Sequence, residues 1–202
     1  MGTDMTLIKQ TDYAGLVAEL VRKRQQTSPK RLQDPGPSAA QVRALFNAAA
    51  QAPDHGLILP WRFVHVSSGA ARARLGEAFA QALRERDPTA TAAQLQDAED
   101  KASRGPLLAL AIARLDDDHP EIPPAERLVS LGCALQNMLL LAHAQGFGAG
   151  LVSGQALNSQ PLRGLFGLSD AEQAVCFVLI GTVGHAKASC ERPAPESFVR
   201  LL

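Results

Sequence analysis

Aromatic residues are scarce in this chain of 202 residues, at 4% of the composition. So few aromatic side chains argue against a surface that stacks nucleic-acid bases. Charge of one sign is not in excess either, because 20 basic residues balance 20 acidic ones. A neutral chain has no long-range field that attracts nucleic acid or an anionic membrane. We therefore expect neither nucleic acid nor a membrane as a partner.

Cysteine is also rare, and Cys133, Cys176 and Cys190 are too scattered for a disulfide framework. There is no CxxC motif and no Cys/His cluster with the spacing of a metal site. Cys133 and Cys176 lie in apolar runs, which favours small buried thiols. No basic segment followed by an apolar stretch begins the chain, as a secretory signal would require. We expect a reduced, cytoplasmic protein.

Long uninterrupted apolar runs are missing as well, so no segment is expected to span a membrane. The longest helical stretch is interrupted or bounded by Gln136, Asn137 and His143. The chain is long enough to bury a proper core, and no internal repeat or long linker divides it. These features predict one domain over residues 1–202.

Periodic patterns define the expected elements. Ser38 with Gln41, and Thr91 with Gln94, have the spacing of capping boxes at helix starts. Helices are expected after residues 12 and 38 and over 69–86, 92–103, 125–145 and 158–166, and strands over 61–67, 106–115 and 174–184. The last two strands are apolar on both faces, which is typical of strands covered on both sides. The pattern predicts an α+β fold with helices on both faces of a small sheet.

The longest expected helix is apolar around nearly its whole circumference between Leu131 and Ala142. Such a helix is normally buried on all sides. Burying a helix of roughly 30 Å completely is difficult inside one domain of this size. The pattern therefore favours a subunit interface. Gly146 is a natural stop at the end of the helix.

The segment AAQAPDHGLILPWRF sets Asp54 and His55 on a loop held by prolines, between a helix and a strand. His55 could be a turn residue bonded to the local backbone, with Asp54 capping the turn. It could instead donate or accept a hydrogen bond to a bound ligand. Trp61 fits core or interface packing better than a substrate platform. No serine or cysteine elbow accompanies the loop, so a catalytic triad is not supported.

Basic residues gather at and beyond the end of the first helix, at Arg22, Lys23, Arg24, Lys30 and Arg31. A solvated helix end would explain them, because the helix dipole favours cations there. An anion site would explain them too, because guanidinium groups make forked hydrogen bonds to phosphate. There is no P-loop, and no GxGxxG follows a strand. The glycines between 146 and 150 are interpreted as a turn before an extended segment.

Four segments, in this order, resemble the FMN-dependent nitroreductases: RKRQQTSPKRL, AAQAPDHGLILPWRF, GCALQNMLLLAHAQGFGAGLVSG and FVLIGTVGHAKASCERPAP. The resemblance is closest to the small branch of NAD(P)H nitroreductases that carries Ala-Pro-Asp-His before Pro-Trp. It implies a mixed central sheet flanked by helices. It also implies an intertwined homodimer whose long central helices pack together, with the tail Phe198 to Leu202 wrapped onto the partner. FMN would lie at the dimer interface and contact both subunits.

The resemblance also implies which residues bind the cofactor. The stretch for the FMN phosphate and ribityl chain maps onto Arg24, Gln25 and Gln26, and a shift to Lys23–Gln25 stays open. The other implied FMN contacts are Gln51, His55, Leu151, Val152, Ser153 and Arg192. The range 141–146 matches a stretch assigned to the nicotinamide cofactor. No side chain is implied as a covalent catalyst or a metal ligand.

The implied activity is that of an oxidoreductase. Hydride would pass from NADH or NADPH to the flavin, and then to a nitroaromatic, quinone or similar small-molecule acceptor, in ping-pong fashion. Two alternatives remain. One is a flavin-binding protein without turnover, a sensor or store, which NADH and NADPH would not bleach. The other is an interaction protein that dimerises through the long helix and binds no flavin.

Overall fold

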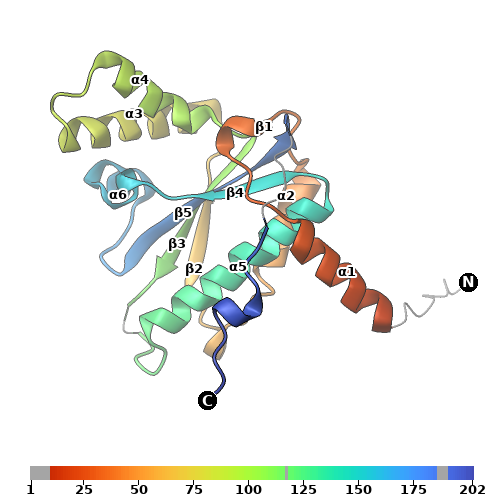
Figure 1. The fold of residues 1–202 in the computed structure, drawn as a ribbon. Coiled ribbons are helices and arrows are strands. Elements are labelled where there is room, and N and C mark those ends of the chain that lie inside the picture. The colour runs from red at the N-terminus through yellow and green to blue at the C-terminus, as the bar shows by residue number, and fades with distance from the viewer. Residues whose placement is uncertain (1–9, 117, 186–190) are drawn as a thin grey trace, which may run out of the picture.

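The computed structural model describes residues 10–116, 118–185 and 191–202. Five strands form one sheet in the order β1-β5-β3-β2, and β4 also pairs with β5 (Figure 1). The strands are β1 (Leu32–Gln33), β2 (Trp61–His65), β3 (Leu107–Arg114), β4 (Gly148–Val152) and β5 (Glu172–Val183). The pairings between them are antiparallel. An isolated bridge between Gln26 and Ala149 is parallel, so the sheet is mixed.

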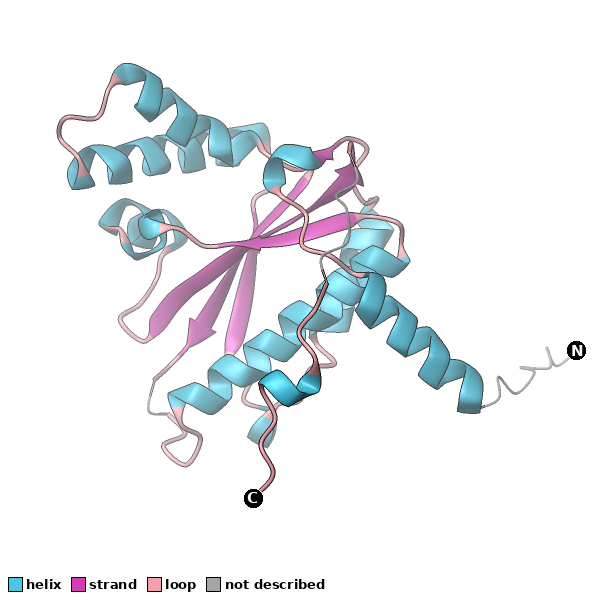
Figure 2. Cartoon of the chain, viewed as in Figure 1, coloured by secondary structure: helices cyan, strands magenta, loops and turns pink. Residues whose placement is uncertain are grey.

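Helices cover both faces of this sheet (Figure 2). They are α1 (Gln10–Lys23), α2 (Ala39–Ala49), α3 (Gly69–Arg86), α4 (Ala92–Asp100), α5 (Pro124–Ala144) and α6 (Gln160–Phe166). Helices α2 and α5 share one hydrophobic core with the sheet. Helices α3 and α6 share the other core, and α4 packs on α3. The predicted α+β class is confirmed.

The alternation of side chains along β3 builds both cores at once. Leu107, Ala109 and Ala111 join the core under α2 and α5. Leu108 and Leu110 join the core under α3 and α6. All but the last residue of the strand are buried, so the prediction of a strand covered on both faces is confirmed.

Local sequence signals place the helix starts. The Ser38 hydroxyl accepts from the Gln41 backbone N–H at 3.4 Å, and the Gln41 side chain accepts from the Ser38 N–H at 2.9 Å. Thr91 and Gln94 form the second predicted capping box in the same way. Each box gives partners to N–H groups that the first helical turn leaves free.

Two details of the sheet differ from the expectation. The strand that begins at Trp61 ends at His65 instead of residue 67. Strand β1 is not foreshadowed by any apolar run, and it exists because the long β5 offers it partners at Thr182 and Val183. Trp61 is buried in the core under α2 and α5, as the packing interpretation predicted.

Helices α1 and α5 keep apolar surface exposed in the single chain. Helix α1 projects away from the sheet (Figure 1), and its apolar residues Leu16, Val17 and Val21 are more than half exposed. On α5, Val129 is 66% exposed and Gly132 also faces solvent. Within one chain α5 is therefore not covered on all sides. Although α5 is long, no helix of the described residues is apolar enough over such a length to cross a bilayer.

Candidate functional site

Two predicted cofactor residues, Gln26 and Leu151, are joined directly although they lie 125 positions apart. The Gln26 side-chain amide donates to the Leu151 carbonyl at 2.6 Å and accepts from the Leu151 N–H at 3.2 Å. The next residue, Thr27, donates its N–H to the Ala149 carbonyl at 2.9 Å. The segment after α1 is thereby fastened along β4 as an additional, irregular strand.

This close approach depends on Gly150. A Cβ placed there would collide with the backbone carbonyl of Thr27, which cannot move aside without breaking the pairing. Gly146 has a different role, because its φ of +86° ends α5 in a left-handed conformation that glycine adopts without strain. The glycine-rich stretch is thus a helix stop followed by a strand, as predicted, and it allows a second chain segment to pack against that strand.

Two open cavities flank the fastened segment. The first, of about 330 Å³, lies towards the end of α5, and the second, of about 590 Å³, lies beside Leu151 and Val152. The basic side chains that line them are Lys23, Arg24, Lys30, Arg31, His143 and His185. No acidic side chain of the described residues lines either cavity. Arg24 and Arg31 form no ion pair within the described part of the chain. This donor set fits a phosphate group.

The structure distributes the basic cluster in a way that its sequence did not reveal. Arg24 and Gln25 line the first cavity, Gln26 lines both, and Lys30 and Arg31 extend the basic lining into the second. Ser28, which the sequence reasoning did not select, also lines the second cavity. A hydroxyl between cations is a useful phosphate donor, but a lone serine in a loop gives no such signal before folding.

His55 lies away from these cavities, in the loop before β2, and packs beside the first turn of α5. Its Nδ1 is 2.8 Å from a carboxylate oxygen of Glu126, so its described partner is a side chain and not the local backbone. Asp54 does not cap the turn His55–Leu57 with its side chain, and its carboxylate instead accepts from the Leu59 N–H, five residues on, at 2.8 Å. Leu57 and Leu59 have φ values of +54° and +48°, a strained conformation for leucine. Such strain often marks a functional loop.

Two carboxylates lie near His55, those of Glu126 and Glu121. The pKa of Glu121 lies below its ordinary value, first because a backbone N–H donates to its carboxylate. His119, whose Nδ1 is 3.2 Å from Glu121, and the charge of His55 lower it further. This end of α5 therefore carries carboxylates, whereas the other end carries the basic cavities.

The predicted cofactor contacts thus form two groups. Gln26 shares a cavity with His143 near the end of α5, whereas His55 contacts Glu126 in its first turn. At about 1.5 Å per helical residue, these two positions on α5 are roughly 25 Å apart. The two groups of a single chain therefore lie towards opposite ends of α5.

The other residues predicted to contact a cofactor lie in four different parts of the structure. Ser153 follows β4 and lines a third cavity together with Val152. Gln51 is exposed just beyond α2, and Arg192 is exposed in the tail. Of the stretch 141–146, His143 and Gly146 line the first cavity, whereas Ala142 is fully buried. Cys176 is buried and Cys133 half-buried, and Cys190 lies outside the described residues.

A family model and a curated relative both match most of this chain. The family model described as "Nitroreductase family" matches residues 23–182. A protein of Haemophilus influenzae named "Putative NAD(P)H nitroreductase" is 33% identical over 176 residues, covering 87% of this chain and 94% of that protein.

Solved structures show the same fold. A nitroreductase-like family protein from Bacillus cereus superposes with a TM-score of 0.80 at 19% identity, covering 98% of both chains. An FMN-dependent nitroreductase from Clostridium difficile R20291 gives a TM-score of 0.63 at 16% identity, covering 90% of this chain and 96% of that one. With its sheet, its basic cavities beside β4 and this match over most of its length, the chain belongs to the nitroreductase family and is an oxidoreductase.

Proposed function

We propose that this protein is an FMN-dependent NAD(P)H oxidoreductase that reduces nitroaromatic, quinone or similar acceptors in ping-pong fashion. Membership of the nitroreductase family supports the reaction class. The observation that carries the proposal within this chain is the basic lining beside the hydrogen bonds between Gln26 and Leu151, which includes no acidic side chain of the described residues. A cytoplasmic location, where both nicotinamide cofactors are available, is part of the same proposal.

The basic cavities are proposed as the phosphate end of the cofactor site. Arg24 and Arg31 would bind the phosphate with forked hydrogen bonds, and Lys30 would add a point charge. Gln26 has a supporting part here, because its amide is already bonded to Leu151. It holds β4 in position, so that the backbone from Leu151 to Ser153 can face the flavin ring.

We further propose that the active form is a homodimer. Since the two groups of contacts lie about 25 Å apart along α5, His55 and Gln51 of one chain would meet a flavin held by the partner's basic cavities. The exposed apolar strips of α1 and α5 give a second chain a surface to bury. The exposed tail residues Phe198 and Leu201 would be covered in the same assembly.

Bound FMN would supply the redox chemistry, accepting electrons from the nicotinamide and delivering them to the acceptor. The chain's own residues would bind, orient and shield it. The loop that carries His55 would form one wall of the site and offer a hydrogen-bonding imidazole. No residue of this chain is proposed as a covalent catalyst.

Purification followed by absorbance spectroscopy tests the proposal. The protein, or the protein incubated with FMN and desalted, should be yellow. Anaerobic NADH or NADPH should bleach it, and a nitroaromatic or a quinone should restore the colour. A protein that takes up no FMN contradicts the proposal. A yellow protein that neither nucleotide bleaches supports the alternative of a sensor or store.

A further inference from the structure

A third cavity lies on the opposite side of β4 from α5, between α3, the turn after α4 and the segment that follows β4. Its volume is about 300 Å³, at the lower end of the range for small-molecule pockets. The apolar residues that line it include Phe79, Leu83, Leu108, Leu157, Phe177 and Leu179. Phe79 and Phe177 meet edge to face, with ring centroids 5.6 Å apart. This is a space for a ring or a short apolar body.

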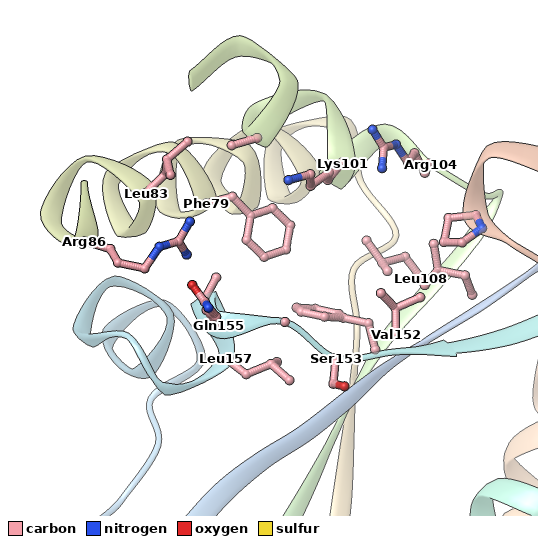
Figure 3. Close-up of a pocket in the computed structure, with 16 residues that line it drawn as sticks. Phe79, Leu83, Arg86, Lys101, Arg104, Leu108, Val152, Ser153, Gln155 and Leu157 are labelled. Atoms are coloured by element: carbon pink, nitrogen blue, oxygen red, sulfur yellow. The ribbon is translucent and has the colours of Figure 1, made fainter. Parts of the chain in front are cut away.

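Three basic side chains line the same cavity as these apolar residues. Arg86 from the end of α3 and Lys101 from the turn after α4 lie around Phe79 in Figure 3, and Arg104 lies beyond Lys101. Arg104 is committed to Asp97 at 3.3 Å, whereas Lys101 is 3.9 Å from the same carboxylate. Arg86 has no ion-pair partner among the described residues. The three cations Arg86, Lys101 and Arg104 together with the carboxylate of Asp97 have a net charge of about +2. A site with this charge fits a carboxylate ligand.

The cavity also touches the proposed cofactor site. Val152 lines both this cavity and the larger basic cavity, and Ser153 and Gly154 continue the lining on this side. These residues include two that the family resemblance assigns to FMN. A molecule in the third cavity would therefore lie next to the strand end that faces the flavin ring.

We propose that the third cavity binds the acceptor, and that the preferred acceptor is an aromatic carboxylate. The aromatic body would lie on Phe79 and Leu157, and the carboxylate would pair with Arg86 and Lys101. The inference rests on the proposed function, since it names the substrate class for the same site. For a nitrobenzoate, NAD(P)H and one proton supply the two electrons and the hydrogens that turn the nitro group into nitroso and water.

Binding is measured first, by titration calorimetry of the FMN-loaded protein with 2-naphthoate, which cannot be reduced. The neutral 2-naphthamide should bind at least tenfold more weakly. Arg86→Gln with Lys101→Gln should weaken naphthoate at least tenfold, change naphthamide less than twofold and leave FMN content unchanged. Arg84→Gln is the matched control, because Arg84 is exposed on the same helix but does not line the cavity.

Turnover is measured second. The value of kcat/KM for 4-nitrobenzoate should fall at least tenfold in the double variant, whereas that for methyl 4-nitrobenzoate should change less than twofold. Equal binding of naphthoate and naphthamide, or equal effects of the Arg84 and Arg86 changes, overturns the proposal. So does displacement of naphthoate by FMN, or a KM for NADPH that rises while naphthoate binding is unchanged. If no FMN is taken up, the proposed function fails, and naphthoate binding to the FMN-free protein still tests the cavity.

Discussion

Replacing Gln26 by alanine should loosen the join between the segment after α1 and β4. The side chain makes two hydrogen bonds to the Leu151 backbone, at 2.6 and 3.2 Å. Each is worth about 0.5–1.5 kcal/mol net. Water can reach this exposed site and replace part of what is lost, so we expect about 1–2 kcal/mol in total. For a domain of this size, that lowers the melting temperature by about 2–8 °C.

Thermal unfolding followed by circular dichroism, on the FMN-free protein, measures this effect. Gln25→Ala is the matched control, since Gln25 is the neighbouring residue of the same type and makes no hydrogen bond within the described chain. Its melting temperature should stay within about 1 °C of the parent, as for most surface changes. If the two variants melt at the same temperature, the hydrogen bonds between Gln26 and Leu151 contribute nothing to the stability of the fold, and the supporting role of Gln26 is refuted.

Three further predictions concern the stability of the fold and the reactivity of a buried thiol. Gly150→Ala should destabilise the protein by about 1–3 kcal/mol in urea unfolding and lower its FMN affinity, because the new methyl group meets the Thr27 carbonyl. A hydrogen bond from Arg62 holds the pKa of Glu172 below its ordinary value. The ion pair should therefore stabilise the fold at neutral pH and lose this contribution as the pH falls below about 4, so the stability difference between the parent and Arg62→Met should shrink in acid. Burial raises the pKa of Cys176 to about 11, so its thiol should react with a disulfide reagent at pH 8 only after unfolding.

Elements with strong local signals were predictable from the sequence. The capping residues Ser38 and Thr91 act within one helical turn, so their effect needs no tertiary contact. The two-faced burial of β3 follows from its unbroken apolar run. By contrast, β1 could not be foreseen from Leu32 and Gln33, because its only reason to be extended is a partner strand that lies far along the chain.

The candidate site shows the same limit. The basic residues near Arg24 were visible as a cluster, but sequence alone left a helix end and an anion site equally open. The cavities support the proposal of an anion site, because their lining includes Arg31 from a different turn and no acidic side chain of the described residues. The contact between Gln26 and Leu151, and the third cavity with Arg86 and Lys101, depend on packing between distant segments. No spacing rule connects such residues before the chain folds.

The most direct test of the central claim is a mixed-dimer measurement. One chain carries Arg24→Ala and Arg31→Ala, the other carries His55→Ala, and FMN per dimer is counted by native mass spectrometry. Because each site is proposed to take its basic end from one chain and His55 from the other, each variant alone should bind FMN at least tenfold more weakly. The mixed dimer should recover one high-affinity FMN. Mixed dimers that bind no better than the separate variants, or a protein that remains a monomer with FMN bound, would contradict a cofactor site shared by two chains.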